Sequence, residues 1–379
     1  MLILLSKILL ISAIVYSFFI ILFLIGTLLK NTKTRSDSNL VSVVIAARNE
    51  EDCIGHILSD LLNQTYPKDK FEVIVVNDQS SDKTAAVVKK IARENPFIRL
   101  VNACDDENGL LTAKKNAIQQ GILASKGEII LSTDADCRVK STWIETMVSY
   151  FNEDVGMIVG FSQIGLPEIK QSHFENLQAI DFLALLTAAQ GSLNLNIPLA
   201  ATGQNIAYRK STFEEVGGFK QIGHRISGDD VLLLQLIHKN TNWNIRFAPD
   251  EKSFNYTFGE KKLKRFLSQR NRWASNGSYQ LKLNKLFFII LANTLIMNLL
   301  LLTLTPISCF YTAISSTVLM SLLLKIAIEL IVILRGTKLY NRRELIKYFP
   351  VWTLLEIPYT VFVGVIGNLG KFIWKGRRN

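Results

Sequence analysis

The sequence predicts an α/β fold with a mostly parallel sheet, joined to membrane-spanning helices at both ends of the chain. Between residues 41 and 133, runs of β-branched and aliphatic residues alternate with segments whose apolar residues recur at helical spacing. This is the pattern of strands alternating with helices. Uncharged apolar stretches of about twenty residues lie near the two ends, and a helix of that length spans a hydrocarbon core of about 30 Å.

Residues 8–29 form the first apolar stretch and carry no charge. The stretch is longer than the apolar part of a cleaved signal peptide, and no small-x-small cleavage site follows it. We therefore expect a transmembrane anchor over residues 1–30. The basic flank from Lys30 to Arg35 places the next domain, residues 38–280, in the cytoplasm by the positive-inside rule. We expect an integral protein of a bacterial inner membrane that contributes to the cell envelope.

The first half of that domain predicts four strands and three helices in alternation. The expected strands are residues 41–47, 71–76, 97–101 and 128–133, and the expected helices are residues 50–64, 81–94 and 112–125. Ser80 or Ser81 is the expected cap of the second helix. Neither a G-x-G-x-x-G nor a G-x-x-x-x-G-K-S/T loop occurs, which argues against a dinucleotide dehydrogenase and a P-loop kinase.

The rest of the chain predicts further helices and a C-terminal membrane region over residues 285–370. Residues 171–199 should be helical and pack on the domain core, with contact to lipid as the alternative. The runs 287–305 and 312–334 predict a transmembrane hairpin. The run 349–369 contains Glu356 and Pro358, so it is either transmembrane or re-entrant. If all three of these runs cross the membrane and the preceding domain is cytoplasmic, the basic tail, residues 371–379, lies on the outer side, against the positive-inside rule.

Composition narrows the class of partner. The net charge of +11 comes from basic residues clustered beside the apolar runs, which indicates attraction to anionic lipid headgroups rather than a nucleic-acid partner. The four cysteines form no C-x-x-C pair and the four histidines are scattered, so neither a zinc site nor a disulfide framework is indicated.

Carboxylates follow two of the predicted strands directly. Asp78 comes after one, and Asp134 and Asp136 come after another. In open α/β sheets, ligands collect at the carboxyl ends of strands. If the strand continues, the carboxylates of Asp134 and Asp136 point to the same side and can share Mg²⁺ or Mn²⁺. The alternative is a turn stabilised by two aspartate side chains.

Two further polar groups precede apolar helices. Asp229 and Asp230 stand before the apolar run 231–237, where one carboxylate can cap the helix and the other can act as a general base. Gln269 and Arg272 lie one helical turn apart, beside Trp273. This arrangement suits hydrogen bonding to a diphosphate or acceptor and stacking on a sugar. A membrane-interface tryptophan with a snorkelling arginine is the alternative.

With these motifs the chain resembles the membrane-bound family 2 glycosyltransferases of the GT-A fold. That group includes the cellulose, hyaluronan and poly-N-acetylglucosamine synthases and the ceramide glucosyltransferases. The resemblance covers roughly residues 41 to 277. It depends on segments that occur in family order: 43–50 (VVIAARNE), 75–82 (VVNDQSSD), 113–114 (AK), 134–136 (DAD), 203–205 (GQN), 208–209 (YR), 216–219 (VGGF), 228–230 (GDD) and 269–273 (QRNRW).

The resemblance implies a binding site for a nucleotide-diphosphate sugar, most simply a UDP-sugar. Ala47, Glu50 and Asp134 would lie near the nucleotide, Asp78 would hold the uracil or ribose, and Lys114 would approach the nucleotide or diphosphate.

The resemblance also implies the reacting groups. Asp136, with Asp134, would hold Mg²⁺ or Mn²⁺ as cofactor, and Asp230 would be the catalytic base. The residues that would close over the diphosphate and acceptor are Asp229, Gln269, Arg272 and Trp273. Asn77 and Asp229 depart from residues common in the family, but Asp78 and Asp230 keep the carboxylates that the mechanism needs.

The expected function is an inverting hexosyl transfer from a nucleotide-sugar to a lipid or lipid-linked hydroxyl in the membrane. A processive polysaccharide synthase is one alternative, although three or four crossings per chain give little material for a channel. A catalytically inactive membrane-anchored scaffold of the same fold is another. A transporter would need more spanning segments and intramembrane polar residues than the pair Lys325 and Glu329. The chain could work with a partner subunit or as a homo-oligomer.

Overall fold

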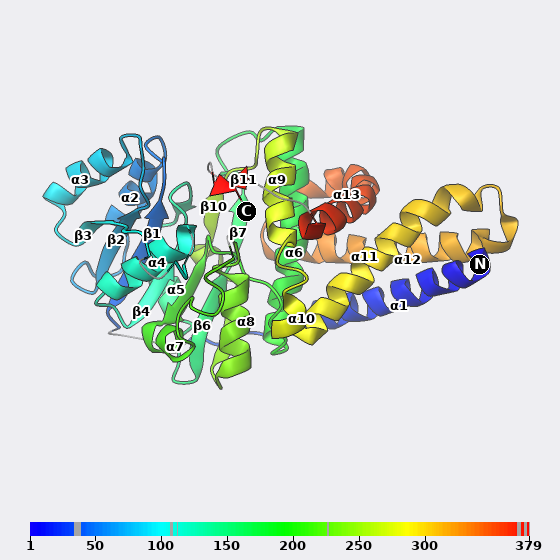
Figure 1. Cartoon of the computed structure of the whole chain (residues 1–379), viewed down its shortest axis with the longest axis horizontal. Helices are drawn as coiled ribbons and strands as arrows, with labels where there is room; N and C mark the ends of the chain where they lie inside the picture. Colours follow the sequence, from blue (N-terminus) through cyan, green and yellow to red (C-terminus); the bar gives the residue numbers. More distant parts are fainter. Residues whose placement is uncertain are drawn as a thin grey trace. The chain divides into compact units, whose positions relative to one another are not determined.

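The computed structural model describes residues 1–33, 39–106, 109–111, 113–225 and 227–369, and the backbone of 373–374 and 377–378. Part of the basic flank after the first apolar stretch and most of the basic tail lie outside these residues. Contacts divide the chain into two compact units (Figure 1). The sheet unit comprises Lys30–Lys170 and Asn196–Phe258, and the helical unit comprises Met1–Leu29, Gln171–Leu195 and Gly259–Asn379. Each is described by itself.

The sheet unit is built on a mostly parallel sheet, as the sequence predicts. Within the described residues it has seven strands in the order β3-β2-β1-β4-β8-β6-β9, and β8 is antiparallel to both of its neighbours. The strands are β1 (Val41–Ala47), β2 (Phe71–Asn77), β3 (Ile98–Asn102), β4 (Ile129–Ser132), β6 (Val155–Gly160), β8 (Ile206–Arg209) and β9 (Asn244–Ala248).

Helices cover both faces of this sheet. Alternate residues of β1, such as Val43 and Ile45, share one buried core with residues of α2, α3 and α5, whereas α4 packs on β1 and β2 from the other side. The helices of the unit are α2 (Ile54–Leu62), α3 (Thr84–Glu94), α4 (Ala113–Ala124), α5 (Trp143–Val148), α7 (Lys210–Glu215), α8 (Val231–Asn240) and the 3-10 turn η1 (Glu251–Ser253). A small second sheet joins β5 (Arg138–Val139), β10 (Asn255–Thr257) and β7 (Ser162–Ile164).

The predicted cap of α3 is wrong. The residue before the helix is Lys83, and Asp82 accepts the Thr84 N–H at 2.9 Å. The serines serve the preceding loop instead, because the Ser80 hydroxyl accepts the Asn49 N–H and the Ser81 N–H donates to the Asn49 side chain.

The helical unit contains the four helical segments of the described chain that are long and apolar enough to cross a membrane. They are α1 (Leu2–Gly26), α11 (Lys285–Ser308), α12 (Thr312–Leu339) and the segment Arg343–Asn368, which joins the 3-10 turn η2 (Arg343–Tyr348) to α13 (Phe349–Leu369). The unit also holds α6 (His173–Asn194), α9 (Leu263–Ala274), α10 (Gln280–Leu283) and the strand pair β11 (Ile373–Trp374) and β12 (Arg377–Arg378). The third C-terminal apolar run is one continuous helix through Pro358.

Helix α6 belongs to the helical unit, contrary to the expectation that it packs on the core of the domain over residues 38–280. Its N-terminus has a capping box formed by Ser172 and Glu175, and the helix packs on α1 and α12. It meets α1 at two glycines so closely that a Cβ on Gly191 would lie 1.9 Å from the carbonyl oxygen of Phe23, and one on Gly26 would lie 2.1 Å from that of Gly191. Small residues allow two helix backbones to approach in this way.

A buried charge cluster ties three of the long helices together. Lys325 of α12 pairs with Glu329 on the same helix and with Glu356 of α13. The hydroxyl of Tyr16, on α1, donates to Glu329 at 3.1 Å. Glu356, which interrupts the third apolar run in the sequence, therefore has a buried cationic partner.

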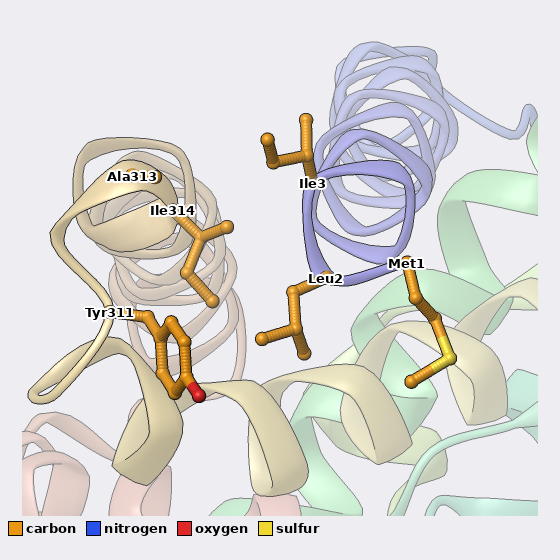
Figure 2. Close-up of a pocket in the computed structure, with 6 residues that line it drawn as sticks. All are labelled: Met1, Leu2, Ile3, Tyr311, Ala313 and Ile314. Atoms are coloured by element: carbon orange, nitrogen blue, oxygen red, sulfur yellow. The ribbon is translucent and has the colours of Figure 1, made fainter.

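An apolar pocket of about 340 Å³ lies between the start of α1 and the turn that joins α11 to α12. Figure 2 shows its lining, which consists of Met1, Leu2, Ile3, Tyr311, Ala313 and Ile314. None of the polar residues that the sequence singles out lines it.

Candidate active site

The carboxyl ends of β1 and β2 meet where the sequence places a nucleotide. Ala47 is the last residue of β1 and pairs with Asn77 of β2. The next residue, Asp78, donates its N–H to the Ala47 carbonyl at 2.8 Å and is 6% exposed. The Arg48 guanidinium lies 3.9 Å from its carboxylate. Glu50 follows on the loop, with its N–H bonded to the Thr84 hydroxyl at 2.8 Å.

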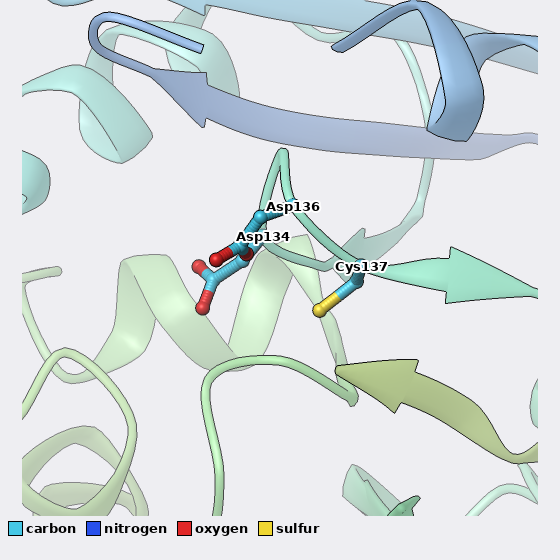
Figure 3. A group of neighbouring side chains, drawn as sticks. All are labelled: Asp134, Asp136 and Cys137. Atoms are coloured by element: carbon cyan, nitrogen blue, oxygen red, sulfur yellow. The ribbon is translucent and has the colours of Figure 1, made fainter. Parts of the chain in front are cut away.

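Asp134 and Asp136 lie side by side, but not for the reason that the sequence suggests. The strand ends at Ser132, and the two carboxylates come together because the chain turns at Ala135 and Asp136. Together with the Cys137 thiol, their ligand atoms lie within 4.8 Å of one another (Figure 3). Strand alternation is therefore not needed to bring the two carboxylates to one side.

This donor set fits a hard divalent cation. Carboxylate oxygens are the ligands of Mg²⁺ and Mn²⁺, and Mg²⁺ is commonly held by one or two carboxylates together with substrate phosphates. Burial raises the pKa of the Cys137 thiol well above its usual value, and Asp136 and Asp134 raise it further. The thiol is therefore protonated at neutral pH, which leaves the two carboxylates as the ligands.

Lys114, on α4, joins this turn to the loop before α8. Its ammonium lies 2.7 Å from Asp134 and 3.0 Å from Asp229. Burial alone would lower the pKa of Lys114, but the two carboxylates outweigh it and raise the pKa above its ordinary value. Lys114 is therefore a fixed cation between two of the predicted site residues.

Asp230 caps helix α8 with one oxygen and holds the loop at Gly203 with the other. It accepts the Val231 N–H at 2.6 Å and the Gly203 N–H at 2.7 Å. Burial, followed by the charge of Asp229, raises the pKa of Asp230. A Cβ on Gly203 would lie 3.2 Å from the Asp229 carboxylate and 3.4 Å from the Lys114 ammonium, so the backbone here forms one wall of the cluster.

Lys115 lies beside this cluster but is not among the site residues predicted from the sequence. It is 1% exposed, and its ammonium donates to the backbone carbonyls of Arg225 and Ser227, just before Asp229 and Asp230. Burial lowers its pKa to about 8. No local signal marks its burial, because two consecutive lysines can both face solvent, as Lys89 and Lys90 of α3 do.

Two other residues of the family-order segments have structural contacts. The Asn205 amide donates to the carbonyls of Phe161 and Ser253 at 2.8 and 2.9 Å. Arg209 donates to the carbonyls of Val155 and Asn152 at 2.9 and 2.7 Å. These side chains hold strands and loops of the sheet unit together.

The fourth predicted group is on α9, in the helical unit. Gln269, Arg272 and Trp273 are all partly buried on this helix. Arg270 between them is 3% exposed, and the sequence analysis does not predict its burial. In the sheet unit, printed contacts bring Lys114, Asp134, Asp136, Asp229 and Asp230 together. Ala47 and Asp78 lie at the ends of β1 and β2, with Glu50 on the loop that follows β1, and the remaining predicted residues lie on α9.

Comparisons with known proteins agree with this fold. A mannosyltransferase from Pyrobaculum calidifontis, solved in complex with GDP-Man and Mn²⁺, matches with a TM-score of 0.63 at 18% identity, over 96% of this chain and 99% of that one. At that identity the match shows a shared glycosyltransferase fold.

Curated relatives match about three fifths of the chain. The probable glycosyltransferase YdaM of Bacillus subtilis is 31% identical over 63% of this chain and 55% of its own length. The β-monoglucosyldiacylglycerol synthase of Trichormus variabilis is 27% identical over 62% of this chain and 48% of its own length. The chain thus spans about half the length of these relatives.

A family model covers almost the whole chain. The model of glycosyl transferase family 21 matches residues 5–377. It confirms the resemblance to membrane-associated glycosyltransferases of the GT-A type, and its family number is 21 where the motifs alone suggest the family 2 group. The chain belongs to glycosyl transferase family 21.

Proposed function

We propose that this protein transfers a sugar from a UDP-linked donor to a hydroxyl of a lipid or lipid-linked acceptor, with inversion at the anomeric carbon, as in the family 2 enzymes that its motifs resemble. The observation that carries the proposal is the cluster of Asp134, Asp136, Lys114, Asp229 and Asp230 beside the carboxyl ends of the parallel strands. Ligands of open α/β sheets bind at such an edge.

The residues divide between the two ends of the donor. Asp78, buried beside Ala47 at the ends of β1 and β2, is placed to accept hydrogen bonds from the uracil or ribose. Asp136 and Asp134 would hold the divalent cation, which would supply positive charge next to the diphosphate. Lys114, already fixed between two carboxylates, adds a cation next to the same group.

Asp230 is the proposed base. A general base works best when its pKa is raised toward the working pH, and burial raises the pKa of Asp230. The two backbone N–H groups that it accepts, from Val231 and Gly203, hold its carboxylate in one orientation. Each carboxylate oxygen has a further lone pair for the acceptor proton.

Gln269, Arg272 and Trp273 of α9 are proposed to contact the diphosphate and the acceptor. Their helix belongs to the unit with the long apolar helices, which favours an acceptor supplied from the membrane. The name of the Trichormus relative specifies a glycolipid product. The basic residues that follow α1 support a cytoplasmic location for the sheet unit, by the positive-inside rule.

The test is an assay of nucleoside-diphosphate release by the purified full-length protein in lipid nanodiscs. A panel of UDP-sugars, with a GDP-sugar for comparison, is offered with Mg²⁺ or Mn²⁺ and with diacylglycerol or ceramide in the nanodisc. We expect release that needs the metal and the acceptor lipid, and its loss in Asp136→Ala and Asp230→Asn. Asp69→Asn, at an exposed turn aspartate of the same unit, is the matched control and should keep full activity.

Each result has a distinct meaning. The anomeric configuration of the product is determined by NMR. A configuration opposite to that of the donor sugar supports inversion, and the same configuration would contradict it. Release with a GDP-sugar alone would keep the transferase and overturn the choice of UDP. Folded protein without release from any donor would overturn the enzyme proposal in favour of a binding role.

A further inference from the structure

Helix α9 carries a buried arginine inside the group of residues assigned to the acceptor. Arg270 is 3% exposed, whereas Arg272 two positions later is only partly buried. Arginine keeps its charge in proteins and is rarely fully buried without a partner. The partners of Arg270 therefore indicate what this side chain does.

The guanidinium of Arg270 lies against the indole of Trp273. Its Cζ atom is 4.3 Å from the centroid of the Trp273 ring and 5.1 Å from the centroid of the Phe266 ring, which precedes Arg270 on the same helix. The Trp273 ring also packs on Phe182 of α6, with centroids 5.9 Å apart. A cation over an indole at this distance is attracted by the ring, and the attraction is strongest where water is excluded.

The same guanidinium is anchored by an acid from another helix. Asp181 of α6 lies 3.0 Å from it and is 8% exposed. The indole N–H of Trp352, on α13, donates to the other oxygen of Asp181 at 3.3 Å. Burial raises the pKa of Asp181, and Arg270 acts in the opposite direction. Helices α6 and α13 thus fix Arg270, and Arg270 contacts Trp273.

Stability alone is a weak reason for such an arrangement. A buried ion pair often adds little to stability compared with apolar residues of the same volume, because both charges lose their hydration. Helix α9 already packs on α13 through aromatic contacts, such as Phe266 with Tyr359 at 5.5 Å. What the ion pair adds is direction, since a planar guanidinium held at one end sets the plane of the ring that stacks on it.

We propose that Asp181 and Arg270 are positioning residues that fix the plane of the Trp273 ring for the acceptor. The inference rests on the proposed function, in which Trp273 contacts the acceptor. Asp181 and Arg270 themselves touch neither donor nor acceptor. Their effect passes through Trp273, so their loss should impair use of the acceptor and leave binding of the nucleotide unchanged.

The decisive experiment is a double-mutant cycle on the full-length protein in nanodiscs. Asp181→Asn and Arg270→Lys should each lower kcat/KM for the lipid acceptor about tenfold, the size of a desolvated cation–π contact. UDP affinity, measured by calorimetry with Mn²⁺, should stay within twofold. If Asp181 acts through Trp273, adding Asp181→Asn to Trp273→Phe should lower kcat/KM no further. Multiplied losses in the double variant would overturn the inference.

A spectroscopic measurement tests the same inference without turnover. The emission of Trp273 is obtained by subtracting the spectrum of Trp273→Phe from that of the parent, and its access to acrylamide is measured. Asp181→Asn and Arg270→Lys should increase the quenching of this component at least twofold. Arg265→Lys, at an exposed arginine of the same helix, should not change it.

The two measurements separate the proposals. Increased quenching in a protein without transferase activity would keep the positioning of Trp273 and overturn the proposed function. Unchanged quenching, with activity intact in Asp181→Asn, would overturn the positioning role and leave the transferase standing. The melting temperature of each variant shows that it is folded before either result is used.

Discussion

Lys114 offers the most direct test of the cluster in the sheet unit. The substitution Lys114→Met keeps much of the side-chain length and removes the charge. In the parent protein this charge lies 2.7 Å from the Asp134 carboxylate and 3.0 Å from the Asp229 carboxylate, so the substitution removes the cation that the two carboxylates share. Both the folding of the unit and its proposed chemistry should therefore respond.

The expected magnitude follows from the burial of the three side chains. They are 18, 27 and 10% exposed for Lys114, Asp134 and Asp229, so solvent screens the pairs only in part. Removing one partner of a buried ion pair costs about 3 to 5 kcal/mol. For a domain of this size, 1 kcal/mol lowers Tm by roughly 2 to 4 °C, so a fall in Tm of about 10 °C is expected.

The assay combines thermal unfolding in nanodiscs with UDP release. Lys114→Met should lose at least about a hundredfold in transfer, the scale of losing one preorganised electrostatic contact to a developing charge. Lys90→Met, at an exposed lysine of α3, is the control and should change neither quantity. Adding Asp229→Asn to Lys114→Met should restore part of the lost stability, because it removes a charge that repels Asp230, but not the activity.

One result would refute the reasoning. If Lys114→Met keeps its Tm within 1 °C of the parent and its release within twofold, the lysine does not bridge the two carboxylates in the working protein. A fall in Tm that Asp229→Asn makes worse would also contradict the bridge.

Three further outcomes are expected. Gly203→Val should lower transfer at least tenfold, because its Cβ would lie 3.2 Å from the Asp229 carboxylate and its methyl groups would crowd the cluster further. The loss of Tm should be smaller than in Lys114→Met, and Gly203→Ala, with the Cβ alone, is the graded control. The folded-state pKa of Lys115 is lowered to about 8 from 10.5, so the unfolded state binds this proton more tightly and the free energy of unfolding should rise with pH between these values by about 3 kcal/mol. Denaturation at several pH values should show that rise flattened in Lys115→Met, and an unchanged slope would contradict the shift. Removing divalent cations with a chelator should abolish transfer, Mg²⁺ or Mn²⁺ should restore it, and Asp136→Ala should raise the cation concentration needed for half-activity.

Local sequence signals were enough to predict β1 to β4 and the carboxylates that follow β2 and β4, whereas the strands of the sheet unit after β4 were not predicted. A strand such as 41–47 is recognisable because every residue is apolar or small, as a strand buried on both faces requires. The carboxylates after β2 and β4 follow directly from where those strands end. Their convergence needs only that parallel strands place their carboxyl ends at one edge.

Long-range partners were not predictable in the same way. The partners of Lys115 are backbone carbonyls 110 and 112 positions along the chain, which carry no residue-type signal. In the sequence, nothing distinguishes Arg270 from the other arginines of its helix, because its partner Asp181 lies far away along the chain. The apolar face of α6 shows that it must be covered, but hydrophobic spacing does not specify whether strands or other helices cover it.

The contacts of α1 bear on how the protein can be handled and made. Its last turn lies against Gly191, its Tyr16 bonds to Glu329, and its Thr27 flank receives the Arg335 guanidinium at 2.8 and 2.9 Å. Deleting residues 1–29 would expose the face of α6 that packs on α1 and would remove these hydrogen bonds of Arg335 and Glu329. A water-soluble catalytic fragment should therefore not be obtainable by deleting this helix. During synthesis, α1 leaves the ribosome long before α12, which follows some three hundred residues later, so the packing of α1 is completed only after α12 has been made.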